Sequence, residues 1–353
     1  MLIAVIKGGA QMIEIDGSYG SGGGQILRTA IGLSTLTGKP CRIDNIRARR
    51  GNPGLREQHL QAILAVNDLA KGKLENAKLG SQEITFYPGE TLLDTLKAIR
   101  LKINISTAGS IGLVLQALLI PATQLLSLEI EIIGGATWGK WAPPLSHLEN
   151  IFFPLLARFG YPVRLVSLKE GFYPKGGAEA KIITSKARFV PLRLTELGEI
   201  RSIRGVSLAS LSLREQKVAE RQRDVAEQGL AKYFKIQPYI DAKYVPANCP
   251  GSGIQLWINT TKSILGANAL GERGKKAETV GEEAVNNLIR EYESGGALDS
   301  HTADQVLPYL AMAGGEIKVS KITDHCKTNI WVIEKFLPAK FAIEDKTISC
   351  VKG

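Results

Sequence analysis

The chain has 353 residues, of which 44% are hydrophobic and 22% are charged, a balance that is typical of globular proteins. Lysine and arginine number 44 against 34 acidic residues, so the net charge of +10 favours a polyanionic partner. No two of the 4 cysteines are spaced C-x-x-C, and the longest apolar run, 111–126, is too short for a membrane span. The composition therefore argues against a zinc knuckle, a dithiol redox motif and a membrane protein, and we expect a cytoplasmic protein with reduced thiols.

The N-terminal part of the chain alternates apolar segments of strand-like and helix-like spacing. A glycine-rich turn at 17–24 and a basic loop at 47–54 follow its first two strands. Glycine allows a backbone to approach phosphate closely, and arginine binds phosphate through two parallel hydrogen bonds; a tight turn and a solvated loop are the alternative interpretations. We expect strands over 12–15, 41–46 and 83–86, and helices over 25–36 and 55–70.

This pattern recurs twice, the second time with an interruption. The second unit is expected to have strands over 102–107, 127–133 and 162–166, a turn at 108–110, and helices over 111–120 and 145–159. The third unit is expected to begin with a strand at 179–184. After the interruption we expect helices over 277–292, from His301 onwards and over 329–336, strands over 316–319 and 341–348, and a loop at 323–328.

Three of these helices can be superposed at a glutamine. Gln25, Gln116 and Gln305 are each followed by two apolar residues, and in this register His301 takes the place that Ser21 has in the first unit. The tripeptide Phe-Tyr-Pro also occurs near the end of the first unit and of the second. A repeat of about 80 residues is too large for a solenoid and predicts an α/β protein with three lobes.

The interruption, 199–270, has the features of a small inserted module. Its composition is more charged, and the spacing of the repeats breaks there. Insertions are tolerated where the two ends of a loop lie close together. Within it we expect a helix over 213–234 and strands over 236–244, 253–259 and 263–267.

His301 is the strongest candidate for a chemically active side chain. Thr302 and Gln305 are spaced as a capping box, which places His301 directly ahead of a helix N-terminus. Such a terminus favours anions through its dipole and its unpaired N–H groups. A histidine beside a bound phosphate is a candidate nucleophile or acid–base group, and Asp304 is placed either to orient its ring or simply to favour the terminus. A solvated or buried structural histidine is the alternative.

Other kinds of site find less support in the sequence. His325 and Cys326 have no further histidine or cysteine nearby in the sequence, so a metal site is disfavoured. The glycine-rich turn is not followed by the Lys-Ser/Thr pair of a Walker A motif, and no G-x-S-x-G nucleophile elbow is present.

Five motifs, taken in order, resemble the RNA 3'-terminal phosphate cyclase family over nearly the whole chain. They are Asp16-Gly-x-x-Gly-x-Gly-Gly-Gly-Gln-Ile-Leu-Arg28, Ile46-Arg-Ala-x-Arg50, Pro53-Gly-Leu-x-x-Gln58-His59-Leu, Gly171-Phe-Tyr-Pro-x-Gly-Gly177 and His301-Thr-Ala-Asp-Gln305. The resemblance implies three ββαβαβ-type lobes like the C-terminal domain of bacterial initiation factor three. They would occupy 1–198 and 271–353, with a small thioredoxin-like insert at 199–270.

The resemblance also implies an ATP-dependent ligase that converts an RNA 3'-phosphate to a 2',3'-cyclic phosphate. A histidine attacks the α-phosphorus of ATP, which gives covalent histidyl-AMP and pyrophosphate. AMP then passes to the RNA 3'-phosphate, and the neighbouring 2'-hydroxyl displaces it. By its place in the motif His301 would be the nucleophile, since neutral imidazole is nucleophilic near pH 7. Mg²⁺ or Mn²⁺ would neutralise the leaving pyrophosphate.

Further site residues follow from the resemblance by motif position. The family often has Glu where this chain has Ser21, and because that Glu is associated with metal binding, the metal ligands are left unassigned here. Residues implied to bind ATP are Gln116, Pro143, Lys276, Ala277, Glu278, Thr279, Val280 and Asp304. Residues implied to bind the RNA phosphate are Arg28, Arg47, Arg50, Gln58 and His59.

Two other functions stay open at the level of sequence. One is that of a catalytically silent relative that binds RNA in ribosome assembly, although such relatives lack the histidine that this chain has at 301. The other is an enolpyruvyl transferase, which is built from similar lobes and acts on small anions, but which would not explain the motif around His301.

Overall fold

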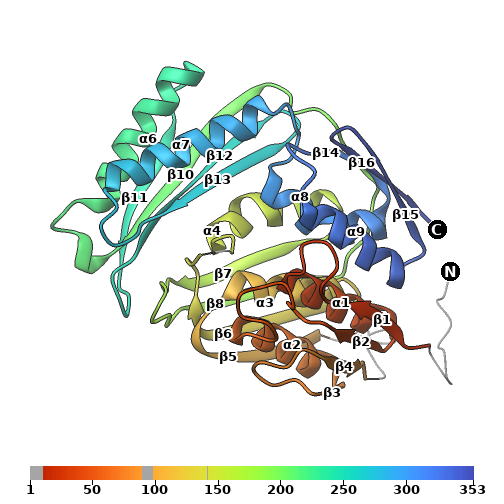
Figure 1. Cartoon of the computed structure of the whole chain (residues 1–353). Coiled ribbons are helices and arrows are strands. Elements are labelled where there is room, and N and C mark those ends of the chain that lie inside the picture. The colour runs from red at the N-terminus through yellow and green to blue at the C-terminus, as the bar shows by residue number, and fades with distance from the viewer. Residues whose placement is uncertain (1–10, 90–97, 141) are drawn as a thin grey trace.

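The computed structural model describes residues 11–89, 98–140 and 142–353. These residues form a mixed α/β protein with four four-stranded sheets (Figure 1). Those parts of the predicted domain 1–198 that fall on 1–10, 90–97 and 141 lie outside the described residues. Within the described ranges no helix combines the length and the apolar character that a membrane span requires.

The first unit confirms the predicted strands and helices and adds one strand, β3. Its sheet has the order β1-β2-β4-β3, in which β1 and β2 are parallel and the other pairs antiparallel. The added strand is short and has Leu74 as its one apolar residue, so it shows too little apolar alternation to be detected. The elements are β1 (Ile13–Asp16), α1 (Gly24–Thr37), β2 (Cys41–Asp44), α2 (Glu57–Ala70), β3 (Lys73–Glu75) and β4 (Ile84–Tyr87).

The second unit repeats this topology with the order β5-β6-β8-β7. The prediction that 179–184 opens the third unit was wrong, because this strand, β8, pairs with β6 and β7. The turn expected at 108–110 is the end of β5. The elements are β5 (Ala98–Ser110), α3 (Ile111–Ala122), β6 (Ser127–Ala136), α4 (Leu145–His147), a π-helical segment (Leu148–Phe152), α5 (Phe153–Arg158), β7 (Val163–Lys169) and β8 (Glu179–Ser185).

The third unit has the same topology, although its first strand is far from the rest in sequence. Strand β9 pairs in parallel with β14, and the order is β9-β14-β16-β15. The single strand expected at 341–348 is an antiparallel hairpin. The elements are β9 (Leu192–Leu194), α8 (Ser300–Ala313), β14 (Gly315–Lys318), α9 (Asp324–Phe336), β15 (Ala339–Glu344) and β16 (Thr347–Lys352).

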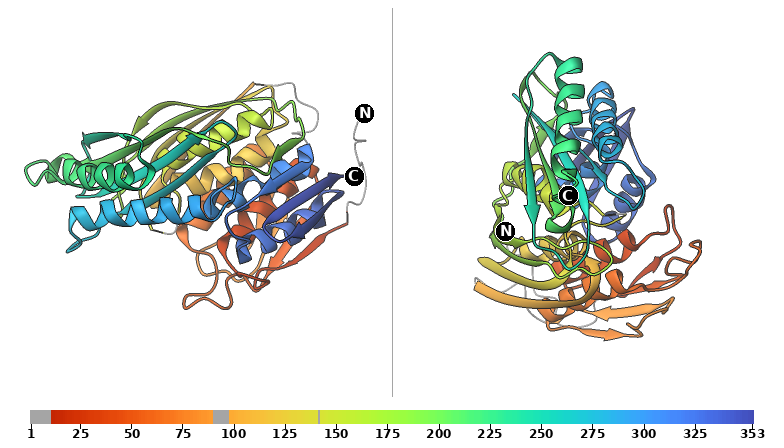
Figure 2. Two further views of the ribbon diagram at one scale, coloured as in Figure 1. Left: turned by 90° about the horizontal axis from the view of Figure 1, so that it is seen from above. Right: turned by 90° about the vertical axis from the view of Figure 1, so that its left-hand side faces the viewer.

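Each of the three units therefore runs β-α-β-α-β-β. The spacing of apolar residues predicted β-α-β-α-β for each unit, and the family resemblance implied the order ββαβαβ. The repeated Phe-Tyr-Pro does not mark equivalent places, because 86–88 closes β4 while 172–174 lies between β7 and β8. One apolar core joins all three units. Helix α3 contacts α1, α2 and α8, and such enclosure explains why it is apolar on nearly every face (Figure 2).

The interruption between β9 and α8 forms a fourth unit with its own core. Its sheet has the order β11-β10-β12-β13, and α6 and α7 pack against each other beside it (Figure 1). Strand β10 was not predicted. The elements are β10 (Ile200–Ser210), a 3-10 turn (Leu211–Leu213), α6 (Val218–Phe234), β11 (Tyr239–Val245), β12 (Ser252–Thr260), β13 (Ile264–Leu270) and α7 (Ala277–Glu293).

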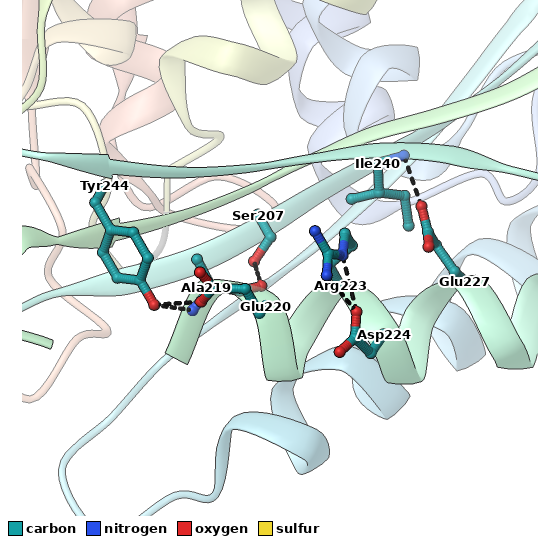
Figure 3. A network of polar contacts seen from close by, with 8 residues as sticks. All are labelled: Ser207, Ala219, Glu220, Arg223, Asp224, Glu227, Ile240 and Tyr244. Atoms are coloured by element: carbon teal, nitrogen blue, oxygen red, sulfur yellow. Dashed lines mark hydrogen bonds and ion pairs between the residues drawn. The ribbon is translucent and has the colours of Figure 1, made fainter. Parts of the chain in front are cut away.

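Side chains of α6 fasten this helix to its sheet (Figure 3). The hydroxyl of Tyr244 on β11 donates to Glu220 at 2.5 Å, and Glu227 accepts from the backbone N–H of Ile240 at 3.1 Å. Helix α7 belongs to the same core through Val280, Ala284, Val285 and Leu288. The packing thus continues beyond residue 270, and the predicted division at 199 and 270 stays a prediction.

Candidate active site

The first turn of α8 places His301 at a capped helix N-terminus. Asp299, not Thr302, is the N-cap: its Oδ1 accepts from the backbone N–H of His301 at 3.1 Å and of Thr302 at 2.8 Å. His301 is therefore the second residue of the helix, and its side chain is exposed. The expected capping box is wrong, since Gln305 donates to the carbonyl of His301 at 2.7 Å instead of accepting from the backbone N–H of the cap residue.

Two elements of the inserted unit, β13 and α7, hold this first turn in place. The second oxygen of Asp299 accepts from the backbone N–H of Gly266 on β13 at 3.1 Å. Glu291 on α7 accepts from both the backbone N–H of Ser300, at 3.1 Å, and its hydroxyl, at 2.6 Å. The position of His301 is thus fixed by contacts from the inserted unit as well as by its own helix.

The glycine-rich turn places the N-terminus of α1 against the imidazole of His59. Gly20 and Gly22 have positive φ angles of 53° and 54°, which residues other than glycine rarely adopt. A Cβ on Gly24 would lie 2.2 Å from His59 Nε2. The cap residue, Gly23, offers no side chain, so the first N–H groups of α1 remain available to an anion.

His59 is held as a neutral hydrogen-bond donor at this terminus. It is 3% exposed, and its Nδ1 accepts from the backbone N–H of Arg56 at 3.2 Å, so the ring proton lies on Nε2. Burial lowers the pKa of His59 to about 3, with the charges of Arg28, Arg47 and Arg56 acting in the same direction. Its neighbour Gln58 lies 3.5 Å away, between the amide nitrogen and Nε2.

The arginines of the basic loop are engaged differently. Arg50 donates to the carbonyl of Ser21 at 2.9 Å and therefore faces the glycine-rich turn. Arg47 donates to the carbonyls of Asn52, at 2.9 Å, and Gly54, at 3.1 Å, so part of its guanidinium holds its own loop. Burial lowers the pKa of Arg28 on α1 to about 10, an effect that the charge of Asp304 opposes.

A pocket between α1, α3 and α8 brings three of the predicted residues together. Asp304 accepts from the Gln25 amide at 2.8 Å, and burial raises its pKa to about 7 while the charges of Arg28 and His301 lower it. The pocket thus contains a guanidinium group, amide side chains and a carboxyl group whose pKa is about 7. Its polar lining includes Gln25, Arg28, Gln116, Asp304, Gln305 and Asn329.

The remaining residues predicted to bind ATP lie apart from this pocket. The carbonyl of Pro143 lies beside Gly112 at the start of α3, where a Cβ on the glycine would be 3.1 Å from it. Residues 276–280 form the start of α7, and none of them lines the pocket. Glu278 pairs with Arg221 of α6 at 2.7 and 2.8 Å, and this pairing lowers its pKa to about 2. Ala277 and Val280 are buried.

Two side chains at the centre of the site were not predicted as site residues. Gln25 is 5% exposed and reaches His325 as well as Asp304. His325 also lies 3.4 Å from the Ser21 hydroxyl, between Nδ1 and Oγ. The glutamine superposition singled out Gln25 only as a repeat marker, and His325 was weighed only as a metal ligand.

The donors that the structure describes do not fit a divalent cation held by protein ligands. In the described ranges no three His, Cys, Asp or Glu side chains converge on one point. Asp16 Oδ1 instead accepts from the Ser18 backbone and hydroxyl and from Asn45. The described side chains therefore form no carboxylate or imidazole site for such an ion.

Comparison with known proteins agrees with the motifs. A family model described as RNA 3'-terminal phosphate cyclase matches residues 19–343. The RNA 3'-terminal phosphate cyclase of Thermococcus kodakarensis is 44% identical over 335 residues, which cover 95% of this chain and 95% of that protein. The one from Methanopyrus kandleri is 43% identical over 345 residues, 95% and 96% of the two chains. The one from Ignicoccus hospitalis is 43% identical over 337 residues, 93% of each.

Proposed function

The chain belongs to the RNA 3'-terminal phosphate cyclase family, and we propose on this premise that it converts an RNA 3'-phosphate to a 2',3'-cyclic phosphate with consumption of ATP. The observation that carries the proposal is an exposed histidine on the capped first turn of α8, the helix that also contributes Asp304 and Gln305 to the lining of the pocket. That arrangement suits a nucleophile working beside a polyphosphate.

His301 is the nucleophile of the first step. An unprotonated ring nitrogen attacks the α-phosphorus of ATP, a P–N bond forms, and pyrophosphate leaves as its P–O bond breaks. The partial positive charge at the first turn of α8 favours the developing negative charge on the phosphoryl oxygens. Gln116 and the carboxyl of Asp304 bind the nucleotide, Pro143 lies beside it, and 276–280 form the outer wall. Mg²⁺ or Mn²⁺ arrives with the ATP phosphates rather than in a protein cage.

The N-terminus of α1 receives the terminal phosphate of the RNA. Arg50 and the Nε2–H of His59 bring a cationic and a neutral donor to this helix terminus, where unpaired N–H groups also favour an anion. We assign Arg28, whose charge acts on His59, to the same phosphate. Arg47 and Gln58 support this group from the basic loop and α2. The 3'-phosphate oxygen takes AMP from His301, and the 2'-hydroxyl then displaces AMP to close the ring.

The test is incubation with ATP labelled at the α-phosphate, followed by denaturing electrophoresis. The protein should acquire label that is acid-labile and stable to alkali, as a phosphoramidate is, and His301→Asn and His301→Ala should abolish it without altering the fold. Label that survives both substitutions, or its absence from the unaltered protein together with RNA binding, would instead support a silent RNA-binding relative. RNA ending in a 3'-hydroxyl should not be cyclised.

The finer description of the fold and the cellular location belongs to the same proposal. The shared β-α-β-α-β-β topology supports lobes like the C-terminal domain of initiation factor three, and the β10–β13 sheet with α6 and α7 supports a thioredoxin-like insert. We assign both likenesses on that basis, and a cytoplasmic location because all 4 cysteines are free thiols.

A further inference from the structure

His325 occupies a place in the site that the proposed steps leave without a role. Its ring nitrogen Nδ1 contacts the Gln25 amide oxygen and lies 3.4 Å from the Ser21 hydroxyl. It belongs to the first turn of α9, and its side chain is open to solvent. A Cβ on Gly23, the cap of α1, would lie 3.7 Å from the His325 ring. The imidazole therefore borders the helix terminus to which the RNA phosphate is assigned.

The hydrogen bonds of Gln25 fix the position of the proton on this ring. The Gln25 amide nitrogen donates to the backbone carbonyl of His325 at 3.1 Å, and a carbonyl can only accept. The other amide atom is therefore the oxygen, which must receive a proton from His325 Nδ1. With the proton on Nδ1, the lone pair of the neutral ring lies on Nε2.

The charges around the ring favour this neutral form. Partial burial lowers the pKa of His325, and the charges of Arg28 on α1, Arg50 of the basic loop and His301 on α8 lower it further. Asp324, the preceding residue on α9, opposes them. A neutral imidazole whose Nδ1–H is held by an acceptor is the arrangement that lets the second nitrogen take up a proton.

We propose that His325 is the general base of the cyclisation step, a role that rests on the proposed function. His325 Nε2 takes the proton of the 2'-hydroxyl, and O2' forms a bond to the 3'-phosphorus. The bond from that phosphorus to the AMP oxygen breaks, and AMP leaves with the electron pair. The proton passes from the imidazolium to solvent, so no additional reactant is required.

The two histidines that border the α1 terminus would then divide the work. His59 carries its proton on Nε2 and can only donate there, which suits a phosphate oxygen. His325 carries its proton on Nδ1 and can only accept at Nε2, which suits a hydroxyl group that must lose its proton. The opposite tautomers arise from two different neighbours, the Arg56 backbone N–H and the Gln25 amide oxygen.

The test separates adenylylation from ring closure with the variant His325→Asn. The asparagine amide retains a donor near Gln25 but has no basic nitrogen, and Lys327→Ala, an exposed position on the same helix, is the matched control. The variant should label with AMP and transfer AMP to RNA normally. It should close the ring at least about 100-fold more slowly, so that the RNA adenylate accumulates. RNA ending in a 2'-deoxy-3'-phosphate, which cannot cyclise, identifies the adenylate.

The pH dependence supplies a second readout. Ring closure by the unaltered protein should fall below the pKa of His325 and be flat above it, whereas closure by His325→Asn should keep rising with pH. Unchanged closure in the variant would overturn the assignment. Parallel loss of AMP labelling and closure would also overturn it, since His325 would then serve ATP or the fold. If the unaltered protein neither labels nor cyclises, the proposed function fails, and the role of His325 fails with it.

Discussion

Nε2 of His147 lies 3.2 Å from the hydroxyl of Thr302, and both side chains are fully buried. Because the Thr302 hydroxyl donates to Asp299 Oδ2 at 2.8 Å, it must accept from His147, which therefore carries its proton on Nε2. Burial lowers the pKa of His147 to about 4, so the ring is neutral. The end of α4 and the cap of α8 are thus joined through a chain of hydrogen bonds that runs from neutral His147 through Thr302 to Asp299.

The first prediction concerns this cap. Asp299→Ala removes acceptors for His301, Thr302 and Gly266, and should lower the free energy of unfolding by about 1–2 kcal/mol and slow AMP labelling. Asp299→Asn keeps one acceptor oxygen and should lose less of both. Denaturant unfolding and the labelling rate measure the two effects. Full stability and full labelling in the alanine variant would show that the cap does not position His301.

A second prediction separates the arginines of the basic loop. Arg50→Ala should leave AMP labelling near normal but reduce AMP transfer to an RNA 3'-phosphate by roughly 10- to 100-fold, because a charge-assisted contact to that phosphate is lost. Arg47→Ala should impair the same step and also lower stability, since Arg47 holds the carbonyls of Asn52 and Gly54. Transfer kinetics and thermal unfolding measure these effects. An equal loss of labelling and transfer would assign the arginines to ATP or to the fold.

The third prediction is a pH dependence of stability that originates at Asp304. Its pKa of about 7 lies above the ordinary value of 3.8, so between these pH values the folded protein binds the proton and the unfolded chain does not. This contribution to stability is complete below pH 3.8 and is lost as pH rises through about 7. Asp304→Asn should flatten that segment of the stability curve in urea titrations. An unchanged curve would mean that another group is responsible.

A fourth prediction concerns the boundary of the inserted unit. A fragment spanning 199–293 should unfold cooperatively by itself, whereas 199–270 should not, because it lacks the apolar face that α7 contributes to the core. Circular dichroism during thermal unfolding compares the two fragments. Cooperative unfolding of the shorter one would support the boundary predicted from the sequence.

Much of the fold was accessible from periodicity, and the errors have local causes. The long helices and buried strands have strong apolar spacing and were found. The short strands β3 and β9 give too few apolar positions to detect. Strand β10 contains Arg201 and Arg204, whose side chains are exposed. These charges made the segment resemble a loop and hid its alternation of apolar and polar residues. At α8 the spacing of Thr302 and Gln305 predicted Thr302 as the capping residue, but the carboxylate of Asp299 is the cap because it accepts hydrogen bonds from both α8 and β13.

The site could be predicted from the sequence only where its residues are neighbours in the chain. The motif around His301 and the basic loop are such segments, and each indicated anion binding. The contacts of Gln25 with Asp304 and His325 join residues about 300 positions apart, and a single sequence contains no signal for such a pairing. The tautomers of His59 and His325 depend on these distant neighbours in the same way.

The insertion between β9 and α8 has a consequence for how the molecule assembles. Leu192 pairs with Gly315, so the third sheet cannot close until the whole intervening stretch has been synthesised. The entropy cost of closing a loop depends on its flexible length, and a folded inserted unit shortens that length greatly. The third sheet should therefore be the last to form. Until β14 has been synthesised, β9 stays unpaired, and chaperones should bind the chain in this partly folded state.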